Sequence, residues 1–159
     1  MRTDNKKHQD ERPRIIVLGD SHTCGLAGEL LHQVKQYFKV TGYIKPNAGL
    51  TELLNSAKEE TSKLTKRDTL IVLSGTNDIE RNLHWKNLTS IVKFLDATQH
   101  TNIILIDVPL RYDPGKRPHI NEEIVKYNMK LHKLTKSFSM PNYLRQQPIG
   151  NFSLNMGYI

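Results

Sequence analysis

The chain has little cysteine and no long hydrophobic run, and each scarcity excludes a class of protein. Cys24 is the single cysteine among 159 residues, so an internal disulfide is excluded and no oxidising compartment is indicated. We interpret Cys24 as a small buried residue in a first helical turn, rather than as a reactive thiol. No apolar run approaches the roughly 20 residues that a membrane-spanning helix needs, which excludes that class.

The first residues also lack the apolar segment of a secretory signal peptide. The stretch MRTDNKKHQDERPR is charged throughout, and the apolar run that follows it is short and ends in a turn. We therefore predict a disordered charged leader over residues 1–13. The expected compartment is the cytoplasm, with the nucleus as the alternative.

Acidic residues are outnumbered, which raises the question of an anionic partner. Lys and Arg total 23 against 16 Asp and Glu, giving a formal net charge of +7. A basic balance favours nucleic acid or another anionic partner. The cations are scattered in small clusters, however, so we interpret most of them as a solvated surface and keep RNA or another anionic partner as the alternative. No pattern sets the oligomeric state.

Apolar runs and helical periodicity alternate along residues 14–138. Strands are predicted at 14–19, 40–46, 68–75 and 102–109. Helices are predicted at 24–38, at 51–64 with Thr51 as N-cap, at 86–98 and at 120–138. Such alternation predicts an α/β fold, a doubly wound parallel sheet with helices on both faces in three αβα layers. Functional sites in such sheets lie at the carboxyl ends of the strands.

Three short polar stretches follow the first three predicted strands. They are GDSH at 19–22, NAG at 47–49 and GTND at 75–78. Ser21 stands where a strand gives way to a helix, and the free N–H groups of a helix start favour a nucleophile and its oxyanion. Gly49 can bring a bare N–H against a substrate oxygen, and the Asn77 amide can donate to an oxyanion. Taken singly, Ser21 is equally well a helix N-cap, and Gly49 and Asn77 are ordinary turn residues.

Together these stretches resemble the SGNH hydrolases, also called GDSL esterases and lipases, over about residues 14–138. GDSH matches the first sequence block of that family, NAG the second and GTND the third, and the closest appearance is to SGNH-like domains of insect and retrotransposon-derived proteins. The resemblance implies a flavodoxin-like fold and hydrolysis of a small carboxylic ester. It implies Ser21 as nucleophile, and the Ser21 N–H, the Gly49 N–H and the Asn77 side chain as oxyanion hole. It implies neither a metal nor an organic cofactor.

The family also has a histidine base near its C-terminus in a D-x-x-H pattern, and this chain has no match to it. Its seven histidines are His8, His22, His32, His84, His100, His119 and His132. His22 adjoins Ser21, but neighbours at a helix start point apart. His119 opens the last predicted helix and is the best substitute, although its surroundings are typical of a surface loop. His32 and His132 are interpreted as helix-surface or partly buried residues.

Residues 139–159 lack the periodicity of the rest, so we expect the sheet to be incomplete at its C-terminal end. With suitable synonymous codons, a shifted reading frame over 148–159 can encode NRELFTKHGLH, which looks like the missing histidine block. We hypothesise that this tail is a frameshifted version of the family's C-terminus. The domain is then an impaired esterase or pseudoenzyme. The alternatives are a non-catalytic binding module of the same fold for RNA or an anionic partner, and a degenerate gene product.

Overall fold

A parallel β-sheet forms the centre of the molecule. The computed structural model describes residues 11–112 and 118–138. Within them the sheet has the order β2-β1-β3-β4, and every neighbouring pair is parallel. The strands are β1 (Arg14–Gly19), β2 (Lys39–Ile44), β3 (Thr69–Leu73) and β4 (Asn102–Leu105). The chain passes from β1 to one neighbour, β2, and then crosses to the other, β3, so β1 and β3 flank the point at which the strand order reverses.

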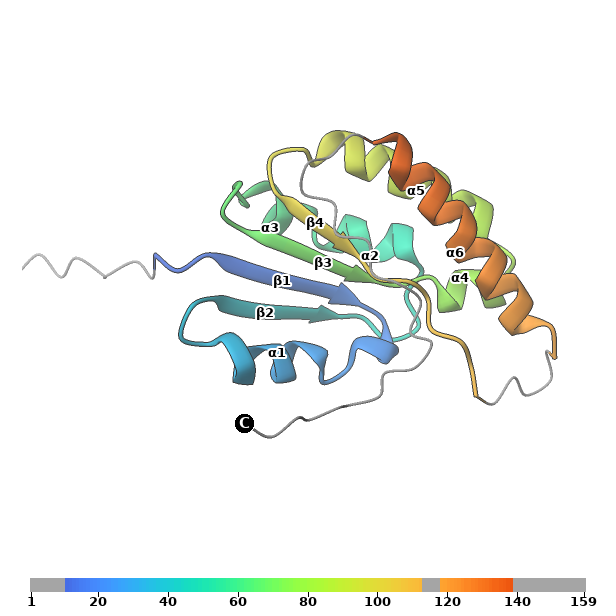
Figure 1. Ribbon diagram of the computed structural model, residues 1–159, viewed down its shortest axis with the longest axis horizontal. Coiled ribbons are helices and arrows are strands. Elements are labelled where there is room, and N and C mark those ends of the chain that lie inside the picture. Colours follow the sequence, from blue (N-terminus) through green and yellow to red (C-terminus); the bar gives the residue numbers. More distant parts are fainter. Residues whose placement is uncertain (1–10, 113–117, 139–159) are drawn as a thin grey trace, which may run out of the picture.

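Helices cover both faces of the sheet (Figure 1). One face carries α1 (Leu26–Val34), which packs so closely on β2 that a Cβ on Gly42 would lie 2.7 Å from the Ala27 Cβ. The other face carries α2 (Leu50–Ser56), α5 (His84–Ala97) and α6 (Ile120–Ser137). Short elements complete the fold: one 3-10 turn (Ser21–Thr23), α3 (Lys58–Ser62) and α4 (Thr76–Glu80). The predicted α/β fold with a helix-flanked parallel sheet is confirmed.

The main core lies between the sheet and the α2–α5–α6 layer. Side chains alternate along each strand, so Ile16 and Leu18 of β1 face the same side as Leu70 and Val72 of β3. These residues belong to one buried cluster with apolar side chains of the three helices, among them the fully buried Ile124.

Several predicted boundaries differ from the structure. The helix expected over 51–64 is two helices, α2 and α3, which meet at Ala57. Thr51 is not the N-cap of α2, because Gly49 takes that position with an extended backbone. Cys24 is exposed in the turn before α1 and is not a buried residue. The last predicted strand and the first predicted helix are both shorter than expected.

Two further expectations concern parts of the chain at its ends. The predicted leader falls largely, and the proposed frameshifted tail entirely, outside the described residues. Within the described residues, none of the helices has the length and apolar character needed to cross a bilayer.

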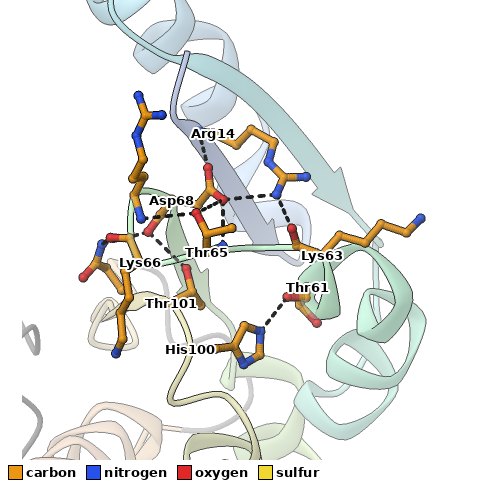
Figure 2. Close-up of polar contacts among 10 residues, drawn as sticks. Arg14, Thr61, Lys63, Thr65, Lys66, Asp68, His100 and Thr101 are labelled. Carbon is orange, nitrogen blue, oxygen red and sulfur yellow. Dashed lines mark hydrogen bonds and ion pairs between the residues drawn. The ribbon is translucent and has the colours of Figure 1, made fainter. Parts of the chain in front are cut away.

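Asp68 ties together the amino ends of three strands (Figure 2). Its carboxylate accepts hydrogen bonds from the Arg14 backbone N–H at 2.7 Å and the Thr65 N–H at 2.7 Å. The Arg14 guanidinium forms an ion pair with it at 3.1 Å. Its backbone carbonyl accepts the Thr101 hydroxyl at 3.0 Å and the Asn102 amide at 2.8 Å. Burial alone would raise the pKa of Asp68, but the hydrogen bonds from Arg14 and Thr65 outweigh it and lower the pKa to about 2.

Candidate active site

Ser21 lies at the carboxyl end of β1, where the chain turns sharply. It is exposed and opens the 3-10 turn, directly after the buried Asp20. Thr23 closes this turn by donating its backbone N–H and its hydroxyl to the Asp20 carbonyl, at 3.1 Å and 2.5 Å. A Cβ on Gly19 would lie 2.0 Å from the Thr23 Oγ1, so the turn requires glycine there. Gly19 and Thr23 thus shape the turn that holds the exposed Ser21 at the carboxyl end of β1.

Asn77 connects the three polar stretches. It lies in α4 directly after β3, and its Nδ2 donates to the Ala48 carbonyl at 3.1 Å. The same Nδ2 approaches the Asp20 Oδ2 at 3.5 Å, which is a weak contact. Residues from the first, second and third stretches thus meet at the carboxyl ends of β1 and β3. That is the strand-order reversal at which open α/β sheets bind ligands.

Asp78 determines the shape of the turn that holds Gly49. Its Oδ2 accepts the Leu50 N–H at 2.8 Å. A Cβ on Gly49 would lie 2.7 Å from the Asp78 Oδ1, so glycine is needed for close approach rather than for an unusual dihedral angle. Burial raises the pKa of Asp78, and the neighbouring Asp20 adds to this; the Leu50 N–H and the Arg81 charge act in the opposite direction. Sequence reasoning gave Asp78 no role, although it is the last residue of GTND.

Gly75 allows the chain to enter α4. Its φ of 137° is a conformation that side-chain-bearing residues rarely adopt. A Cβ there would lie 2.9 Å from the Val108 Cγ2 and 3.4 Å from the Tyr127 ring. Burial raises the pKa of Tyr127, whose hydroxyl accepts the Asn87 amide at 3.3 Å, so this phenol stays neutral. α4 itself was missed from the sequence, because GTND was interpreted as a turn.

The histidine proposed as a substitute base lies on the surface. His119 precedes α6 with a side chain 77% exposed, and its Nδ1 is 3.4 Å from the Glu122 Oε1. Among the described side chains, no histidine ring is hydrogen-bonded to Ser21. The side chain of His22 lies outside what the structure describes. The structure therefore does not bring His119 together with the serine.

A histidine–carboxylate pair that the sequence did not reveal joins β4 to α6. The His132 Nε2 lies 2.8 Å from the Asp107 Oδ1, and both side chains are largely buried. Asp107 comes two residues after β4. This position just past a strand end is the feature by which the sequence could have pointed to the pair. β3 stands between β4 and β1, so β4 and β1 lie about 10 Å apart. The pair joins α6 to the segment that follows β4. No cluster of three potential metal ligands is found in the described part of the chain.

Comparison with known proteins finds solved structures of similar fold. A member of the lipolytic protein G-D-S-L family from Veillonella parvula is 16% identical, with a TM-score of 0.65 over 78% of this chain and 73% of that one. An acetylxylan esterase from Geobacillus stearothermophilus is 15% identical, with a TM-score of 0.59 over 79% and 72%. A psychrotrophic esterase from a Pseudoalteromonas species, solved inhibited by monoethylphosphonate, is 17% identical, with a TM-score of 0.51 over 82% and 75%.

No protein-family model and no curated protein matches the chain. The likeness is therefore one of fold: a parallel sheet of order β2-β1-β3-β4, with helices on both faces and GDSH and GTND at the ends of β1 and β3. The chain has the α/β fold of the GDSL, or SGNH, hydrolases.

Proposed function

We propose that this domain is an SGNH-type serine hydrolase that acts on small carboxylic esters through Ser21. The observation that carries the proposal is the position of Asn77. Its amide is hydrogen-bonded to Ala48 and approaches Asp20, directly beside the strand end that presents Ser21. The esterases of similar fold support the same reaction class.

The reaction would proceed by acyl transfer. The Ser21 Oγ attacks the ester carbonyl carbon, the alcohol leaves, and water then hydrolyses the acyl-enzyme. The carbonyl oxygen becomes an oxyanion that the Ser21 N–H, the Gly49 N–H and the Asn77 amide stabilise. The Asn77 amide has two N–H donors. One is hydrogen-bonded to the Ala48 carbonyl, which fixes the orientation of the amide. The other makes only the weak contact to Asp20, so it is the one that would donate to the oxyanion. Removing one such donor typically costs about 10²–10³-fold in rate.

We further propose that catalysis in this chain is impaired. Among the described residues neither His119 nor His132 is hydrogen-bonded to Ser21: His119 faces Glu122 at the surface, and His132 pairs with Asp107. Ser21 then gives its proton to solvent or to a weak acceptor. Loss of a triad member commonly removes several orders of magnitude in rate, while an oxyanion hole alone still leaves about 10³–10⁴-fold over water.

The test is acylation by 4-nitrophenyl acetate, followed by peptide mass spectrometry. We expect slow acetylation of Ser21 itself, separated by fragment ions from the exposed Cys24 on the same peptide, absent in Ser21→Ala and retained in the exposed control Ser62→Ala. Asn77→Ala should slow it about 10²–10³-fold. Equal acetylation kinetics of the wild-type and Ser21→Ala proteins would exclude the nucleophile.

Added imidazole separates impairment from full activity. If the base is missing, imidazole should raise the Ser21-dependent rate, measured as the difference between the wild-type protein and Ser21→Ala. A fast Ser21-dependent rate that imidazole leaves unchanged would show that the chain already has a base. The esterase proposal would then stand and the impairment proposal would fail.

The second candidate function is that of a non-catalytic module that binds RNA or another anionic partner. A groove between α2–α3 and α5 favours it. The groove measures about 650 Å³, and Lys58, Lys86 and Lys93 are among its lining residues, with no carboxylate among them. Binding of a single-stranded RNA that weakens steeply with added salt would support this candidate. No binding at low salt would remove it.

A further inference from the structure

A second groove lies between α5 and α6. These two helices lie side by side on the same face of the sheet (Figure 1). The groove measures about 360 Å³, and its wall is mostly apolar. The lining residues are Trp85, Leu88, Thr89, Val92, Lys130, Lys133 and Leu134. We call this the α5–α6 groove. None of its lining residues is acidic, and none belongs to the candidate active site.

Trp85 stands at the groove with most of its surface in solvent. It is the single tryptophan of the chain, and it is 59% exposed. The Lys130 Nζ lies 3.3 Å from the centroid of its ring, a cation–π contact. Exposing an indole beside an apolar groove to water costs free energy. The same arrangement suits contact with a partner surface that has an apolar interior and a polar outer layer.

Three lysines of α6 form one stripe beside the groove. Lys126, Lys130 and Lys133 follow the spacing i, i+4, i+7, which places them on one side of the helix. The outward-facing Met129 between them is 55% exposed. The surface therefore combines an apolar recess, an aromatic side chain, an exposed methionine and a row of positive charges.

We propose that the α5–α6 groove docks on a bilayer surface that contains anionic phospholipid. Trp85 and the apolar wall would contact the acyl-chain boundary, and the lysine stripe would contact lipid phosphates. A lipid surface fits better than RNA, because stacking on a base needs an open aromatic face. Lys130 already covers a face of the Trp85 ring, and the recess itself is apolar.

Fluorescence of the wild-type protein tests the proposal, since Trp85 is its sole tryptophan. Titration with phosphatidylcholine vesicles containing phosphatidylserine should shift the emission to the blue, and pure phosphatidylcholine vesicles should not. Each lysine near an anionic surface contributes about fivefold in partitioning, so the double variant Lys130→Gln/Lys133→Gln should bind about 30-fold more weakly. The matched control Lys35→Gln/Lys39→Gln removes the same charge at the end of α1 and the start of β2, and should bind like the wild-type protein.

Four outcomes would overturn the proposal. The first is an equal loss in the two double variants, which would indicate net charge rather than this surface. The second is a shift with RNA but not with vesicles. The third is an emission already blue-shifted and unresponsive to vesicles, which would indicate that residues 139–159 occupy the groove. The fourth is a shift that grows with protein concentration alone, which would indicate a second copy.

Discussion

The substitution Asp68→Asn at the amino edge of the sheet should lower the free energy of unfolding, by an amount that depends on pH. Asp68→Asn keeps the size of the side chain but removes the negative charge that faces the Arg14 guanidinium. It also brings an amide N–H donor close to groups that are themselves donors, such as the Thr65 N–H. The carboxyl has a pKa of about 2 in the folded protein against an ordinary value of 3.8. This difference corresponds to about 2.5 kcal/mol of stability at neutral pH, since one pH unit is worth about 1.4 kcal/mol.

The sign of the pH dependence follows from the lowered pKa. A carboxyl with a folded pKa below its unfolded pKa stabilises the protein fully above the unfolded value, and this stabilisation is lost as the pH falls through the folded value. At pH 2.5 the same relation leaves about 0.8 kcal/mol. The part of the stability gap between the wild-type protein and Asp68→Asn that arises from the charge should therefore shrink to about a third between pH 7 and pH 2.5.

Urea unfolding followed by circular dichroism at pH 7, 4 and 2.5 measures this gap directly. At pH 7 the midpoint of thermal unfolding should fall by about 5–10 °C, given about 2–4 °C per kcal/mol for a chain of this size. Asp96→Asn, at an exposed position of α5, is the matched control and should change stability by less than about 0.5 kcal/mol. A gap that is the same at pH 7 and pH 2.5 would refute the reasoning, because it would arise from packing and not from the charge.

Two glycine substitutions test the turns around the candidate site. Gly75→Ala should destabilise the fold by about 3 kcal/mol, seen in urea unfolding, because its φ is strained for alanine and the new Cβ would press on Val108. Gly49→Ala has no dihedral strain, but its Cβ would push the Asp78 carboxylate away from the Leu50 N–H. We expect Gly49→Ala to lower the free energy of unfolding by about 1–3 kcal/mol in the same assay.

Gly28→Ala is the control for both glycine substitutions. Gly28 lies in α1, where an added Cβ would meet no atom within 4 Å, so alanine should stabilise the helix by about 0.5–1 kcal/mol. If Gly49→Ala proves as harmless as Gly28→Ala, the contact between Asp78 and the turn is not a constraint.

Much of the candidate site could be predicted because its signals are local. Ser21, Gly49 and Asn77 each follow a predicted strand, and the carboxyl ends of parallel strands meet at one edge. The structure places Asn77 beside Ala48 and Asp20, as that argument requires. The role of Asp78 could not be predicted, because it rests on a hydrogen bond across 28 positions of the chain.

The sequence by itself determined the alternation of strands and helices, the apolar faces that form the core, and the three polar stretches at strand ends. Hydrophobic periodicity carries these, because it is a property of neighbouring residues. The tertiary structure decided the division of the helix over 51–64, the pairing of His132 with Asp107, and the exposure of Trp85 beside Lys130. Those features depend on which distant segments pack together, and only the folded chain brings their atoms into contact.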